Sequence, residues 1–102
     1  MNRTALKKNT YPYITFCDEI ADGVPIIEGT RITVRTIASY YQMGMSVDEI
    51  LTSLSHLTTS QVHSALAYYF DHQSEIDKDI KESTDVEFWK NQVISYSMEK
   101  NK

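Results

Sequence analysis

Three successive segments of the chain carry apolar side chains at the spacing of an α-helix, and this repetition restricts the fold more than any other feature. In each segment the apolar residues fall at positions i, i+3, i+4 and i+7, so they share one helical face. The three sets are Val34, Ile37, Ala38 and Tyr41; Val47, Ile50, Leu51 and Leu54; and Val62, Ala65, Leu66 and Tyr69. Since each helix must bury its apolar face, we expect the three to pack together as one core.

Short polar motifs mark where these helices begin. Residues 46–49 (S-V-D-E) and 58–61 (T-T-S-Q) have the pattern of a capping box, which satisfies free N–H groups in the first helical turn. Gly44 can end the first helix. The second and third predicted helices, at about 46–54 and 59–72, are separated by a turn of a few residues, which is the helix-turn-helix arrangement.

Two segments before the helices have the composition of β-strands. Residues 13–17 (Y-I-T-F-C) and 24–28 (V-P-I-I-E) are rich in β-branched and aromatic side chains, and a polar, turn-rich stretch joins them. Pro25 lacks an N–H group, so the second strand should lie at an edge. Because a two-stranded ribbon is marginal on its own, we expect the helices to cover it. The sequence therefore predicts a mainly α fold with a short N-terminal β ribbon.

The chain of 102 residues is long enough for one domain. We expect a flexible N-terminal arm at 1–12, the ribbon and the three-helix core at 13–73, and a C-terminal helical extension at 74–102. Val86, Trp89, Val93 and Tyr96 form a further apolar stripe in this extension, with Phe88 beside it.

Composition excludes several classes of protein. A single cysteine, Cys17, allows no intramolecular disulfide and suits a reducing cytosol. The N-terminus has no apolar core of a signal peptide, and no apolar run is long enough to span a membrane, so we expect a cytoplasmic protein. The net charge of -4 is uneven, because residues 36–102 hold most of the acidic side chains. Such an acidic region repels phosphate and suits a basic protein partner.

The order and spacing of three motifs resemble a known family. G-V-P-I-I-E-G-T-R-I-T-V at 23–34, Y-Q-M-G-M-S-V-D-E-I-L at 41–51 and L-T-T-S-Q-V-H-S-A-L-A-Y-Y at 57–69 are similar to the family called domain of unknown function 433, grouped with VapB-type antitoxins. The resemblance covers about residues 13–77. It implies a homeodomain-like helix-turn-helix fold in a small cytoplasmic protein, encoded beside a PIN-like ribonuclease toxin.

The resemblance also implies how such a protein acts. Family antitoxins neutralise the toxin by binding it, and they commonly repress their own operon as dimers. This chain departs from the family at Val24 and Glu28, where basic residues are frequent, and at His63, where the third helix often carries Arg or Lys. These departures remove positive charge from the surfaces that would meet DNA.

Candidate DNA-binding residues lie in the third helix and in the N-terminal third. Gln and Thr side chains can reach base edges or phosphates, but the chain has no Lys or Arg from 36 to 77. Since phosphate neutralisation supplies most non-specific affinity, cations elsewhere would have to compensate. The candidates are Thr59, Gln61, His63, Arg31, Arg35, Lys7 and Lys8.

A second set of candidates would bind a protein partner. Tyr40–Tyr41 and Tyr68–Tyr69 are adjacent pairs, and in each pair only one ring can face the core of its own helix. The stripes assign Tyr41 and Tyr69 to the core, so Tyr40 and Tyr68 should cover another element or a partner. In the extension, acids would steer a toxin towards apolar anchors. The partner-binding candidates are Tyr68, Val86, Phe88, Trp89, Val93 and Tyr96.

Motifs for catalysis or metal binding are absent from the sequence. The three histidines lack zinc-ligand spacing, and the acids Asp71, Glu75 and Asp79 follow one helical face, which is typical of a solvated surface. We therefore expect no enzyme activity, metal or cofactor. The family resemblance then favours an antitoxin that binds a PIN-like toxin, is a homodimer and can bind operator DNA. The alternative is a DNA-binding regulator without a toxin.

Overall fold

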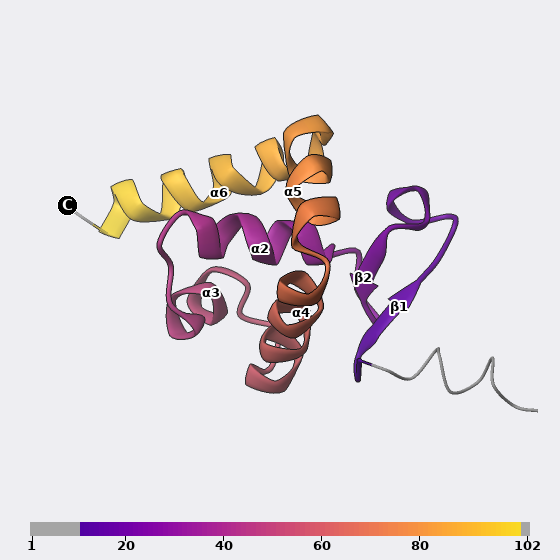
Figure 1. Ribbon diagram of the computed structural model, residues 1–102. Coiled ribbons are helices and arrows are strands. Elements are labelled where there is room, and N and C mark those ends of the chain that lie inside the picture. Colours follow the sequence, from indigo (N-terminus) through magenta and orange to yellow (C-terminus); the bar gives the residue numbers. More distant parts are fainter. Residues whose placement is uncertain (1–10, 101–102) are drawn as a thin grey trace, which may run out of the picture.

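The predicted ribbon and helices are all present in the computed structural model, which describes residues 11–100 and, within the last helix, side chains up to residue 92. Figure 1 shows the ribbon at one end of the molecule, and α6 running alongside α2. The mainly α fold is confirmed. In chain order the elements are β1 (Ile14–Phe16), the 3-10 helix η1 (Ala21–Gly23), β2 (Pro25–Ile27), α2 (Val34–Gln42), α3 (Val47–Ser53), α4 (Thr59–Asp71), α5 (Gln73–Glu82) and α6 (Asp85–Lys100).

The two strands pair in antiparallel fashion, with Ile14 opposite Ile27 and Phe16 opposite Pro25. A turn after β2 is closed by Thr30, whose hydroxyl donates to the Ile27 carbonyl oxygen at 2.8 Å. Gly29 has a φ of 82°, a left-handed conformation that glycine adopts without strain. The ribbon therefore feeds directly into α2 and contributes Ile14 and Ile27 to the core.

The helix boundaries follow the capping signals. Ser46 and Glu49 form a complete capping box at α3, and Thr58 and Gln61 form another at α4. Gly44, with a φ of 91°, follows the end of α2. Because these signals act within a few residues, the sequence located all three helices of the core to within a residue or two.

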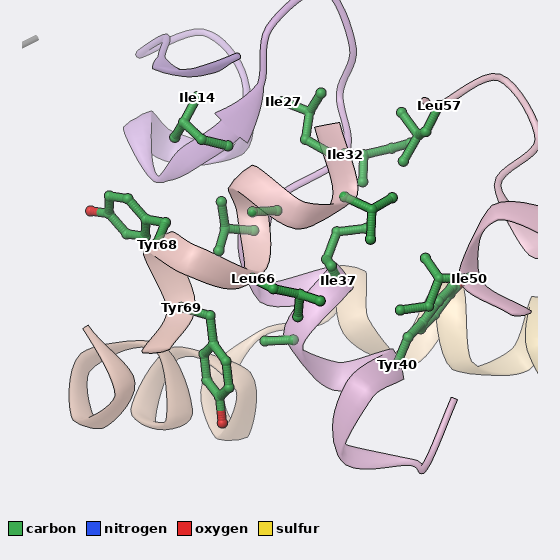
Figure 2. Packing of buried hydrophobic residues seen from close by; sticks show 14 of the residues in the cluster. Ile14, Ile27, Ile32, Ile37, Tyr40, Ile50, Leu57, Leu66, Tyr68 and Tyr69 are labelled. Atoms are coloured by element: carbon green, nitrogen blue, oxygen red, sulfur yellow. The ribbon is translucent and has the colours of Figure 1, made fainter. Parts of the chain in front are cut away.

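In the tyrosine pair of α2, the prediction for Tyr41 is wrong. Tyr40 is fully buried, whereas Tyr41 is 45% exposed. The prediction placed Tyr41 in the core and left Tyr40 to cover another element or a partner, and α2 does contact α5 and α6. In Figure 2 the Tyr40 side chain extends towards Ile50 of α3, and its hydroxyl donates to the Trp89 carbonyl oxygen of α6 at 3.2 Å. α6 therefore helps to bury Tyr40, which agrees with the expectation that this ring covers another element.

The extension that begins at residue 74 packs against the three-helix core. Ile76 of α5 and Val86 of α6 are each 1% exposed. Ile80 and Trp89 lie partly buried against the same core cluster. At least up to Trp89, the extension is therefore a layer of the folded domain and not an arm that awaits a partner.

Candidate functional site

An ion pair joins the beginnings of α2 and α6. The Arg35 Nε donates to Asp85 Oδ1 at 2.9 Å, and the Thr33 hydroxyl donates to Asp85 Oδ2 at 3.2 Å. The Arg35 and Asp85 side chains are partly buried, at 15% and 29% exposed. The sequence had assigned Arg35 to DNA, but the structure places its guanidinium against a carboxylate of its own chain. This neutralises the charge that a phosphate would need.

The other DNA-binding candidates do not share one environment. Thr59 and His63 are exposed on α4, and Arg31 is exposed beyond the ribbon. The Gln61 side chain already accepts a hydrogen bond from the Thr58 backbone N–H at 2.8 Å as part of the cap. Lys7 and Lys8 lie outside the described residues. The structure therefore brings no group of free cations onto α4 within the described residues, because residues 36–77 contain no Lys or Arg.

The partner-binding candidates divide into accessible and buried side chains. Phe88 is 54% exposed, Trp89 is partly buried and Val86 is buried. Tyr68 is also buried, because its ring stacks on His72 at 4.0 Å between centroids and meets Tyr11 edge-on at 5.0 Å. Tyr68 and Val86 are therefore core residues, a correction of their predicted role. The side chains of Val93 and Tyr96, in the later part of α6, lie outside the description.

An exposed cluster that the sequence did not predict lies where α2 and α4 end. We define the Tyr41–Phe70 patch as Tyr41 and Phe70, which are 45% and 47% exposed. The Tyr41 and Phe70 rings meet edge-on, with centroids 5.3 Å apart. Sequence reasoning had placed Tyr41 in the core. The sequence did contain a sign of this cluster. Phe70 directly follows the core residue Tyr69, and because neighbouring residues of a helix face different directions, Phe70 had to point away from the core.

A hydrogen-bonded carboxylate borders this patch. Asp77 Oδ1 accepts from the Tyr69 hydroxyl at 2.9 Å and from Gln42 Nε2 at 2.7 Å. The Tyr69 ring lies 6.5 Å from Tyr41 and 5.3 Å from Phe70, measured between centroids. The network connects α2, α4 and α5, so it fixes a negative charge beside the exposed rings.

Comparison with known proteins now identifies the family. A family model described as "Protein of unknown function (DUF433)" matches residues 14–69, more than half of the chain. The chain belongs to the DUF433 family. Its fold is similar to the crystal structure of a DUF433 member protein from Anabaena variabilis ATCC 29413, with a TM-score of 0.64 and 28% identity over 76% of this chain and 73% of that chain. No curated protein matches.

The DUF433 match runs from the start of β1 to residue 69 in the last turn of α4 and leaves α5 and α6 outside it. These two helices help to form a polar pocket of about 250 Å³ in this DUF433 protein. Three carboxylates and one guanidinium contribute to its walls, so its charge is mainly negative. The lining residues are Asp22, Arg35, Asp79, Glu82, Ser83 and Thr84.

Other kinds of site are not supported by the described residues. Among them, no group of three His, Cys, Asp or Glu side chains is placed to share a metal ion. Within the same part of the chain, no helix is long and apolar enough to cross a membrane. The described surface of this DUF433 protein presents apolar rings, hydrogen-bonding groups and carboxylates, all of which can contact a binding partner.

One buried phenol makes the fold sensitive to alkali. Burial raises the pKa of Tyr40 from 10.0 to about 12. The folded state thus favours the neutral phenol, so this stabilisation is complete below pH 10 and is lost as the pH rises towards 12. We expect a loss of about 2–3 kcal/mol from this group over that interval. Urea unfolding at several pH values should show a smaller loss for Tyr40→Phe, and equal losses would contradict the assignment.

Proposed function

We propose that this DUF433 protein is the antitoxin of a type II toxin–antitoxin pair, which binds and neutralises a PIN-like ribonuclease toxin encoded beside it. The observation that carries this proposal is the ion pair between Arg35 and Asp85. It occupies the only cation between α2 and α4, and the other cations with described side chains are Arg31 before α2 and Lys78, Lys81 and Lys90 on α5 and α6. The segment from α2 to α4 therefore offers nucleic acid no free cation, which favours a protein as its partner.

The distribution of acidic groups supports the same choice of partner. Residues 36–77 contain five carboxylates and no Lys or Arg: Asp48, Glu49, Asp71, Glu75 and Asp77. The pocket beside Arg35 adds Asp22, Asp79 and Glu82. Acidic surfaces accelerate association with basic proteins and disfavour wrong partners. A ribonuclease with a basic face would therefore meet a complementary charge.

Growth rescue tests the proposal directly. The neighbouring PIN-like protein is expressed from an inducible promoter, with or without this chain on a second plasmid. Expression of the toxin alone should arrest growth, and co-expression should restore it and yield a complex on affinity purification. A toxin variant without its catalytic carboxylates controls for general toxicity of overexpression. If growth stays arrested although this chain is soluble, the antitoxin assignment is wrong.

DNA binding is the second candidate function, either as autorepression or as the role of a regulator without a toxin. The observation that favours it is the exposure of Thr59 and His63 on α4, with Arg31 also exposed. Fluorescence anisotropy with the upstream DNA at low salt measures this activity. Binding that weakens steeply with salt and with Arg31→Ala would support it. The predicted homodimer is measured in the same samples by light scattering.

A further inference from the structure

We propose that residues 11–13 form a strap that closes over an aromatic face of α4, and that this strap inhibits a partner from contacting that face until it opens. The strap consists of Tyr11, Pro12 and Tyr13, which directly precede β1. The opening itself is a property of the fold, and only its effect on the partner rests on the proposed antitoxin function.

A small number of contacts hold the closed strap on α4. The Tyr11 hydroxyl donates to Asp71 Oδ2 at 2.5 Å, and the Ser64 hydroxyl donates to the Pro12 carbonyl oxygen. The Tyr11 ring meets the Tyr68 ring edge-on, with centroids 5.0 Å apart. Both hydrogen bonds lie at exposed positions, where water can replace them at modest cost. The strap can therefore open locally while the core stays folded.

Tyr13 has the properties of a hinge for this opening. Its φ of 68° is left-handed, a conformation that strains a bulky side chain. Its carbonyl oxygen is held in the ribbon, because the Glu28 backbone N–H donates to it at 2.8 Å. Rotation about the N–Cα bond of Tyr13 moves the residues before it and leaves this carbonyl in place. Opening therefore relieves strain at Tyr13 without taking the ribbon apart.

The face beneath the strap is aromatic. Tyr68 is 8% exposed, and its ring stacks on His72 at 4.0 Å between centroids. The Tyr11 ring also lies edge-on to His72 at 5.9 Å, so one side chain contacts both rings. Phe16 is 57% exposed, and its ring lies 6.3 Å from Tyr68. When Tyr11 leaves, these rings form one accessible aromatic surface, and such surfaces commonly anchor protein interfaces.

Tyr11 shows which chemistry this surface accepts. It places an aromatic ring against Tyr68 and His72 and a hydrogen-bond donor against Asp71. A protein partner that presents an aromatic side chain with a donor group, such as tyrosine, fits the same site and competes with the strap. The apparent dissociation constant of this partner rises by the inverse of the open fraction. The closed strap is therefore an autoinhibitory contact.

Amide hydrogen exchange of the full chain, followed by NMR, measures the opening. The Ile14 N–H donates to the Tyr11 carbonyl oxygen at 3.2 Å, so this bond breaks when the strap opens, whereas the Glu28 N–H stays bound to Tyr13. Tyr11→Ala should speed exchange at Ile14 about tenfold or more and change exchange at Glu28 less than about twofold. Tyr41→Ala is the matched control, because it removes the same atoms from an exposed ring on α2, and it should leave Ile14 unchanged.

Two milder variants separate the causes. Tyr11→Phe removes only the bond to Asp71 and should speed exchange at Ile14 about threefold or more. Tyr13→Asn should slow it about threefold, because asparagine adopts a left-handed φ more readily than tyrosine does. If Ile14 and Glu28 change together in these variants, or if neither changes, the strap does not open as a separate unit and the proposal is wrong.

Calorimetry with the purified, catalytically inactive neighbouring PIN-like toxin tests the inhibition. Tyr11→Ala should tighten binding by about the factor by which exchange at Ile14 rises, because both depend on the open fraction. Unchanged or weaker binding by a variant with an open strap would show that the strap does not inhibit, and the antitoxin function would stand. If neither chain binds the toxin, the antitoxin assignment and the inhibition both fail, while the exchange rates still decide whether the strap opens.

Discussion

Replacing Tyr40 with alanine is expected to lower the free energy of unfolding by about 3–5 kcal/mol, whereas the same change at Tyr41 should cost less than about 1 kcal/mol. The two residues are neighbours in α2 and lose the same atoms. Tyr40 is fully buried, however, and Tyr41 is 45% exposed. Removing the Tyr40 ring would leave a cavity between α2, α3 and α6, which the rigid helices could only partly fill.

Urea denaturation followed by circular dichroism measures both variants. Tyr40→Phe separates the ring from its hydroxyl, which donates to the Trp89 carbonyl oxygen. This variant should lose only about 1 kcal/mol, the usual contribution of one hydrogen bond. Equal losses for Tyr40→Ala and Tyr41→Ala would contradict the burial of Tyr40 beneath α3 and α6.

The same pair of residues shows what the sequence could and could not predict. Capping boxes, the ribbon and the three core helices were predicted close to their observed bounds, because each depends on residues near one another in the chain. The choice between Tyr40 and Tyr41 depends on α6, which contacts α2 from about 50 residues away. A row of apolar residues identifies one buried face of a helix, but it does not reveal that another helix, here α6, will also cover a second face.

The candidate site was less predictable than the fold for a related reason. Arg35 looked available for phosphate, but its partner Asp85 lies 50 residues later and no local pattern links the two. Tyr68 and Val86 looked available for a partner, but contacts from distant segments bury both. The solvent exposure of a side chain depends on all tertiary contacts, including those from distant parts of the chain. The acidic character of residues 36–77, in contrast, could be read directly because charge does not depend on packing.

Placing a charge at Val86 is the second change with a large expected effect. Val86 is 1% exposed at the beginning of α6, and it lies next to Asp85, which binds Arg35 and Thr33. Val86→Asp would bury a carboxylate without a compensating cation, because Arg35 already pairs with Asp85. We expect the free energy of unfolding to fall by about 3 kcal/mol or more, or α6 to detach from the core.

The single tryptophan of the chain distinguishes these two results. Trp89 lies partly buried against the core, so detachment of α6 should shift its fluorescence to longer wavelength while the other helices keep their circular dichroism signal. Phe88→Asp is the matched control, since it introduces the same charge two residues later at a side chain that is 54% exposed. It should change stability by less than about 1 kcal/mol. If Val86→Asp were as stable as Phe88→Asp, α6 would not be packed against the core, and the Arg35–Asp85 pair would not hold it there.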